Sequence, residues 1–160
     1  MGLPGSGKSY FAKHLSSRLK CVHISSDDTR QKMAAMGKYS MKDKMAVYGQ
    51  MASAAKTVLE QEGKVILDAT FFKKTIRDPF VSLAMENNLP YVLIWIEAPM
   101  EVTKERLSKK REDSEADFEV YRKLAKEFEK PEPPYLKLVS RQDNIQQMVR
   151  KAENYLLQLL

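Results

Sequence analysis

The residues best suited to chemistry stand at the start of the chain. Gly2-Leu-Pro-Gly-Ser-Gly-Lys8-Ser9 matches the spacing G-x-x-x-x-G-K-[ST]. Glycine suits such a loop because its backbone N–H groups must turn towards one anion, and a Cβ atom would block the approach of phosphate oxygens. A helix that begins at Gly7 would add its unpaired N–H groups and its positive dipole end to the same anion. The pattern therefore predicts a loop that binds the phosphates of a nucleotide.

The residues of this loop have different expected roles. We expect Lys8 to reach the β- and γ-phosphates, and the Ser9 hydroxyl to ligate Mg²⁺. The competing interpretation is a glycine-rich turn that only caps an ordinary helix. On the phosphate-binding interpretation, the residues expected to contact the nucleotide are Gly2, Pro4, Gly5, Ser6, Gly7, Lys8, Ser9 and Tyr10.

Two carboxylates follow short apolar segments. Asp27 follows the expected strand 21–25, and Asp68 lies in the apolar run 65–69. Strand ends in parallel sheets face the ligand crevice. We therefore expect Asp27 to position the hydroxyl that accepts the phosphate, with Arg30 on the same helix face. We expect Asp68 to hold a water on Mg²⁺ or to order the acceptor site.

Each of these acidic positions also has a purely structural interpretation. Asp28 and Gln31 have the spacing of a capping box for a short helix, and Arg30 could simply pair with Asp28. Asp68 could merely end a strand. The residues after Asp68 are informative, because Ala69 follows it directly where water-activating ATPases usually carry glutamate. The chain also lacks the Asn-Lys-x-Asp motif of GTPases, so transfer to a substrate is favoured over hydrolysis.

A basic run occupies residues 104–111, with five positive charges against one glutamate. Phosphoryl transfer gains most from cations over the phosphates and from a lid that excludes water. We therefore expect a lid over about residues 104–128, with Lys110 or Arg111 as the cation that contacts the transferred group. The alternative is an ordinary solvated helix face. Ser114 with Asp117 has the spacing of a helix cap.

Short β-branched segments alternate with amphipathic ones, which predicts an α/β fold with a parallel sheet flanked by helices. One strand is missing from this pattern, because a phosphate loop should follow a strand that launches it. Either the true start of the protein lies upstream, which we favour, or the neighbouring strands close directly on each other. Pro79 is expected in the first turn of its helix. The expected helices are 8–19, 29–36, 41–62, 75–88, 100–110, 115–128 and 142–160, and the expected strands are 21–25, 65–69, 91–96 and 136–139.

Composition sets the broad class of protein. The 160 residues are 43% apolar and 30% charged, which is typical of one folded domain and excludes intrinsic disorder. Lys and Arg number 27 against 21 Asp and Glu, so the net charge of +6 favours phosphates or other polyanions as ligands. No apolar run could span a membrane, and a single Cys21 excludes an internal disulfide. We expect one domain over 1–160 in the cytoplasm, with His14 and His23 isolated and binding no metal.

An ordered set of segments resembles a known group of proteins. GLPGSGKS, SSDDTR, VILDAT, IEAP before ERLSKKR, SEAD-x-x-VY and FEKPEPPY together resemble the P-loop kinases that include polynucleotide 5′-hydroxyl kinases, near zeta toxins and gluconate kinases. The resemblance implies a five-stranded parallel sheet with a small helical lid. It implies that Asp27 activates the acceptor hydroxyl with Arg30 as its partner, and that Asp68 ends the third family strand. Near Lys110 the family usually carries arginine, which alone can bind a phosphate in bidentate fashion.

These observations predict a P-loop kinase that uses ATP and Mg²⁺. It would move the γ-phosphate to a hydroxyl of a small molecule or of a nucleic-acid 5′ end. The sequence shows no aromatic stacking array beyond the lid, which slightly favours a small molecule. The alternative function is a nucleotide-binding module that regulates a partner and does not catalyse.

Overall fold

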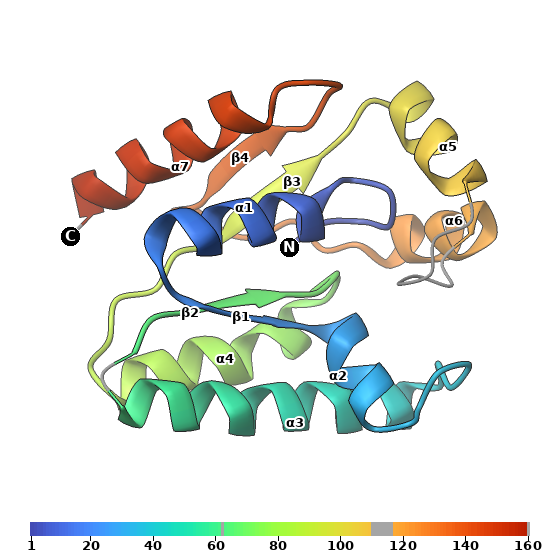
Figure 1. Ribbon diagram of the computed structural model, residues 1–160. Helices are drawn as coiled ribbons and strands as arrows, with labels where there is room; N and C mark the ends of the chain where they lie inside the picture. The colour runs from blue at the N-terminus through green and yellow to red at the C-terminus, as the bar shows by residue number, and fades with distance from the viewer. Residues whose placement is uncertain (62, 110–116, 160) are drawn as a thin grey trace.

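A computed structural model describes residues 1–61, 63–109 and 117–159, and within them short strands alternate with helices (Figure 1). None of the helices in this part of the chain is long and apolar enough to cross a membrane. The strands are β1 (Val22–Ser25), β2 (Val65–Asp68), β3 (Ile94–Glu97) and β4 (Leu136–Val139). The helices are α1 (Lys8–Leu19), α2 (Ser26–Lys32), α3 (Met41–Glu60), α4 (Lys74–Glu86), α5 (Met100–Ser108), α6 (Phe118–Glu127) and α7 (Ile145–Leu159).

The strands form two parallel pairs. β1 pairs with β2 in a register that places Ser25 opposite Asp68, and β3 pairs with β4 so that Glu97 lies opposite Val139. The parallel arrangement confirms the expected α/β fold, because each parallel pair needs a crossover connection that contains a helix. The register brings the ends of β1 and β2 to the same edge. The residues that follow these two strands therefore lie close together.

The first residues of the chain lie between the two strand pairs. The Met1 backbone donates a hydrogen bond to the Ile94 carbonyl at 2.8 Å and accepts one from the Ile96 N–H at 2.9 Å. On the other side, the Gly2 N–H donates to the Thr70 carbonyl at 3.3 Å. β2 and β3 are not paired with each other. The interpretation in which the neighbouring strands close directly is therefore wrong, and the described residues form two pairs of strands where the resemblance implied one five-stranded sheet.

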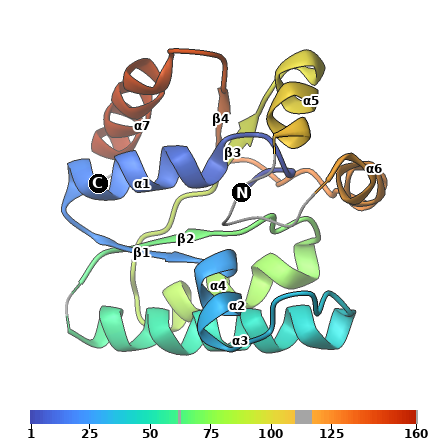
Figure 2. The same cartoon turned by 45° about the vertical axis from the view of Figure 1, so that its right-hand side comes forward.

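Helices cover the strands on two sides (Figure 2). Two clusters of buried apolar side chains form the core. One cluster lies where α3 and α4 pack below β1 and β2, and Met51 and Phe72 are almost fully buried there. The other lies between α1, α7 and the β3–β4 pair and includes Phe11, Leu15 and Ile96. Each cluster places one strand pair on a fixed helical layer, so the loops at the ends of the strands have firm support.

Three details differ from the sequence-based expectation. Pro79 is the sixth residue of α4 and not part of its first turn, because α4 begins at Lys74, whose N–H donates to Glu129 Oε2 at 2.6 Å. Pro79 is exposed, so water can solvate the carbonyl that its missing N–H leaves unpaired. The third strand spans Ile94–Glu97 and not 91–96. Met45, which we expected on the buried stripe of α3, is 45% exposed.

Candidate functional site

The glycine-rich loop curves into the start of α1 and leaves a cradle of backbone groups. Gly7 is the N-cap of α1, with φ of +86°, a conformation that favours glycine. A Cβ atom on Gly7 would lie 2.8 Å from Ser140 Oγ and 2.9 Å from Arg106 Nη1. No side chain caps α1, so its first N–H groups remain available to an anion. The Ser6 hydroxyl is buried and has no hydrogen-bond partner, which also leaves a donor for a ligand.

The structure places the residues expected to contact a nucleotide along this loop. Gly2, Pro4 and Ser6 are buried, and they hold the loop against the strand ends. Gly5, Gly7, Lys8 and Ser9 are half-buried. Tyr10 is 60% exposed, and its ring centroid lies 4.3 Å from that of His14. The part of the loop that would touch phosphate is therefore accessible, while its base is fixed.

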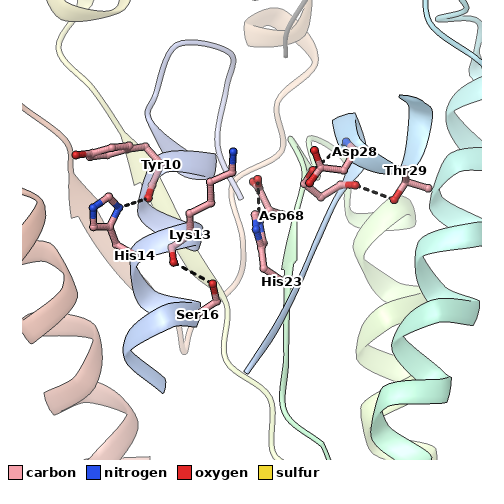
Figure 3. A network of polar contacts seen from close by, with 9 residues as sticks. Tyr10, Lys13, His14, Ser16, His23, Asp28, Thr29 and Asp68 are labelled. Carbon is pink, nitrogen blue, oxygen red and sulfur yellow. Dashed lines mark hydrogen bonds and ion pairs between the residues drawn. The ribbon is translucent and has the colours of Figure 1, made fainter. Parts of the chain in front are cut away.

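Asp68 lies beneath the loop and is paired with an unexpected neighbour. Its Oδ2 atom is 3.4 Å from His23 Nε2, and the two side chains point toward one another from β2 and β1 (Figure 3). Both side chains are largely buried, and neither of these two atoms has a hydrogen-bond partner. The expectation that His23 is isolated is therefore wrong. The register of β1 and β2 explains the contact, because Asp68 lies opposite Ser25 and His23, two residues before Ser25, is on the same face of the strands.

The electrostatic surroundings keep Asp68 charged. Burial alone would raise the pKa of its carboxyl group, but the His23 side chain, the Lys8 ammonium group and the Ser9 hydroxyl together lower that pKa below its usual value. Lys8 and Ser9 of the loop therefore both act on Asp68. The cluster presents an ionised carboxylate at the foot of the phosphate cradle.

These residues fit a Mg²⁺ ion bound together with a nucleotide. Mg²⁺ prefers oxygen ligands and usually takes one or two from the protein, with phosphate oxygens and water completing its shell. The Ser9 hydroxyl and the orphaned Oδ2 atom of Asp68 are such oxygens. Across residues 1–61, 63–109 and 117–159, no three His, Cys, Asp or Glu side chains group as a metal site by themselves. The donor set therefore fits a metal that arrives with phosphate.

The short helix α2 places Asp27 beside the same strand edge. Ser25 caps this helix, accepting a hydrogen bond from the Asp28 N–H at 3.0 Å, while the Thr29 hydroxyl donates to the Ser25 carbonyl at 2.7 Å (Figure 3). The interpretation of Asp28 as the capping residue with Gln31 is therefore wrong. Because Ser25 lies opposite Asp68, the first turn of α2 follows the same edge of the β1–β2 pair.

Arg30 is buried and is held by the segment that follows α2. Its Nη1 atom donates to the Lys38 carbonyl at 2.7 Å, and its guanidinium lies 4.5 Å from the centroid of the Tyr39 ring. The neighbouring Tyr48 is buried, and this burial raises the pKa of its phenol to about 12. A hydrogen bond with the Phe71 backbone and the charge of Arg30 act in the opposite direction. Asp27 raises the same pKa further. Asp27, Arg30 and Tyr48 therefore lie in one electrostatic neighbourhood.

Arg106 in α5 is a residue of the site that the sequence did not single out. Its Nη1 atom donates to the Gly5 carbonyl at 3.2 Å and to Ser140 Oγ at 3.0 Å, and its Nη2 atom donates to the Arg141 carbonyl at 3.3 Å. It thereby ties the phosphate loop to the β4–α7 connection. The basic run 104–111 pointed to this helix and placed Arg106 on one face with Lys110, but the cation expected at the transferred group was Lys110 or Arg111. Lys110, Arg111 and Ser114 lie outside the described residues.

A cavity of about 330 Å³ opens beside this arginine. It lies between the start of α1 and the β4–α7 connection, and Gly7, Tyr10, Arg106, Ser140 and Asn144 are among the residues that line it. Its position next to the phosphate cradle suits the base and ribose of a nucleotide. Of the residues we expected to bind nucleotide, Gly7 and Tyr10 line this cavity.

A glycine-rich loop that opens a helix beside parallel strands, with lysine and serine next to a strand-end carboxylate, defines a P-loop NTPase fold. The family described as "AAA domain" matches residues 1–131. The chain belongs to this family.

Solved structures of P-loop kinases share the fold along nearly the whole chain. The APS kinase CysC of Mycobacterium tuberculosis, solved with AMPPNP and APS, has a TM-score of 0.74 at 19% identity. The match covers 98% of this chain and 94% of the CysC chain. A gluconokinase from Sinorhizobium meliloti has a TM-score of 0.72 at 17% identity, with coverage of 99% and 94%. Kti12 of Chaetomium thermophilum, solved with ADP-AlF3, has a TM-score of 0.72 at 22% identity, with coverage of 96% and 95%. At these identities the likeness shows the fold alone.

Proposed function

We propose that the protein is an ATP-dependent phosphotransferase, which moves the γ-phosphate to a hydroxyl of a small molecule or of a nucleic-acid 5′ end. The observation that carries the proposal is the meeting of three features at one strand edge. These are the phosphate cradle, the ionised Asp68 beneath it, and the first turn of α2 with Asp27. The APS kinase and the gluconokinase of the same fold support a small-molecule acceptor over a nucleic acid.

The residues of the cradle have different roles in binding the nucleotide. The N–H groups at the start of α1 and the Lys8 ammonium group bind the β- and γ-phosphates and compensate the charge that develops on them. Ser9 and Asp68 would hold Mg²⁺, which would supply positive charge to stabilise the transferring phosphate. His23 fixes the orientation of the Asp68 carboxylate from the other side. Arg106 holds the loop in the shape that this binding requires.

Asp27 has the role of orienting the acceptor hydroxyl and taking up its proton. Its place in the first turn of α2 supports this role, since the turn lies at the strand edge that ends in Asp68. The residue after Asp68 is Ala69, which is fully buried and carries no group that could activate water. Transfer to an acceptor is therefore favoured over hydrolysis. Residues 104–128 act as the lid in this proposal, with Lys110 or Arg111 as its cation.

The test combines nucleotide binding with a transfer screen. Wild type is expected to bind Mg-ATP and to label at least one acceptor among oligonucleotides, sugars and antibiotics when supplied with γ-labelled ATP. The Lys8→Ala variant should lose nucleotide binding and transfer while its circular dichroism remains that of wild type. The Asp27→Asn variant should retain Mg-ATP binding and lose turnover. Near-normal transfer by Asp27→Asn would show that another group serves as the base.

A nucleotide-binding module without catalysis is the second candidate. The contacts of Arg30 favour it, because its guanidinium is already engaged by the Lys38 carbonyl and the Tyr39 ring and is not free to turn towards an acceptor. Mg-ATP binding without label transfer to any acceptor in the screen would favour this function. For an active enzyme, the salt dependence of the acceptor's binding constant distinguishes a nucleic-acid acceptor from a small molecule. The binding constant of a nucleic acid should fall steeply with salt, because only a polyanion releases many counterions.

A further inference from the structure

Lysine side chains from several elements gather around the ring of Phe72, outside the phosphate loop. Lys44 in the first turn of α3 has its Nζ atom 5.1 Å from the centroid of this ring. Lys73, the N-cap of α4, has its Nζ atom 5.5 Å from the same centroid. Phe72 itself is only 2% exposed, so the ring forms a fixed apolar floor beneath the two ammonium groups. Lys123 on α6 acts on Lys44 from the lid side.

The charges in this cluster do not balance. Glu127 forms an ion pair with Lys73 at 3.0 Å. Within the part of the chain that the structure describes, no carboxylate lies within ion-pair distance of Lys44. Burial lowers the pKa of the Lys44 ammonium group. The positive charges of Lys123, Arg30 and Lys73 lower this pKa further, whereas the negative charge of Glu127 raises it. Glu127 therefore pairs with Lys73, while Lys44 is surrounded by more positive than negative charge.

Arg30 extends the cluster towards the acceptor side of the site. It is 6% exposed, and its Nε atom is buried without a hydrogen-bond partner. Through its effect on Lys44 it connects the cluster with α2, the helix that carries Asp27. Lys44 and Lys73 are half-buried, whereas Lys123 and Lys42 are exposed, so the first two do not belong to an ordinary solvated face. A half-buried ammonium group with an excess of like charge around it is costly unless an anion joins it.

We propose that Lys44, Lys73 and Lys123 form a subsite for an anionic group of the acceptor, a phosphate or sulfate ester. The inference rests on the proposed phosphotransfer, since it assigns the acceptor of that reaction to the anionic esters. Two ammonium groups above an apolar floor, with the charge of Lys123 acting on one of them, suit a compact oxyanion that can accept charge-assisted hydrogen bonds. Glu127 keeps Lys73 in place and is too weak a counter-charge to satisfy all three lysines.

Inorganic phosphate is the probe for this subsite, because it carries the proposed chemistry without an acceptor skeleton. The full chain saturated with Mg-ADP, which fills the phosphate loop, is titrated calorimetrically with phosphate. We expect one phosphate to bind. The Lys44→Gln variant should bind it about tenfold more weakly, the loss expected for one charge-assisted hydrogen bond. The matched control Lys42→Gln removes a charge from the same helix turn and should bind phosphate as wild type does.

The design separates this proposal from phosphotransfer itself. Mg-ADP affinity is measured for each variant, and it should be the same for Lys42→Gln, Lys44→Gln and wild type. The phosphate titration is repeated without nucleotide on a Lys8→Ala background, where the phosphate loop is disabled but the lysine cluster is intact. If phosphate binds to this background and Lys44→Gln weakens the binding, the result supports the subsite even if transfer is never observed. No phosphate binding in either setting, or equal weakening by Lys42→Gln, would overturn it while leaving the proposed function standing.

Discussion

Replacing Arg106 with glutamine tests whether this side chain fixes the phosphate loop. The Arg106 guanidinium makes hydrogen bonds of 3.2 Å to the Gly5 carbonyl, 3.0 Å to Ser140 Oγ and 3.3 Å to the Arg141 carbonyl. A glutamine side chain is too short to make these contacts. At about 0.5–1.5 kcal/mol net for each of the three bonds, their loss should lower the free energy of unfolding by about 1.5 to 4.5 kcal/mol. For a chain of this size that corresponds to a Tm lower by about 3–18 °C.

The same substitution should weaken nucleotide binding, since Arg106 lines the cavity beside Gly7 and holds the loop that forms the cradle. Thermal unfolding followed by circular dichroism and calorimetric titration with Mg-ADP measure the two effects. Arg122→Gln is the matched control, because among the described residues Arg122 forms an ion pair with Glu119 alone and both side chains are well exposed, so neither quantity should change measurably. Equal Tm and equal Mg-ADP affinity for the two variants would refute the role assigned to Arg106.

Two further predictions concern Asp68 and Tyr48. In wild type, ADP should bind more tightly with Mg²⁺ than in the same titration with EDTA. Asp68→Asn should largely abolish that difference in affinity. If the variant shows the full Mg²⁺ effect, Asp68 does not hold the metal. Burial raises the pKa of Tyr48 to about 12. A raised pKa contributes stability that is complete below the unfolded value near 10 and is lost as the pH rises towards 12. Urea unfolding at pH 9 and 11.5 should therefore show wild type losing about 2 kcal/mol more than Tyr48→Phe, and parallel losses would contradict this.

Local patterns identified the phosphate loop and most of the helices. Lys8 and Ser9 lie where the spacing predicts because the loop and the helix after it are contiguous in sequence, so backbone conformation alone fixes their relation. The last strand, Leu136–Val139, also has the expected bounds. Asp68 lies at the end of β2, close to Lys8 and Ser9, as its position after an apolar run indicated. Each of these features depends on interactions within a few residues.

Boundaries set by distant contacts could not be found in this way. α4 begins at Lys74, one residue before the expected start, where the Lys74 N–H is bound by Glu129, which is far along the chain. The cap of α2 is Ser25, a strand residue, although Asp28 has an equally suitable spacing for that role. When several residues satisfy the same local rule, the tertiary contacts decide between them.

The amino-acid sequence by itself indicated the kind of ligand to expect, since a glycine-rich loop ending in Lys8 and Ser9 can turn its amides towards a compact anion. Only the tertiary structure decided which side chains surround that loop. His23 and Asp68 come together through the register of two strands, and Arg106 reaches Gly5 from a helix about a hundred residues later. The physical reason is that the backbone donors of a loop are positioned by residues next to them in the sequence. The charged side chains around the loop come from distant segments, and only the packing of those segments decides which of several similar residues comes close.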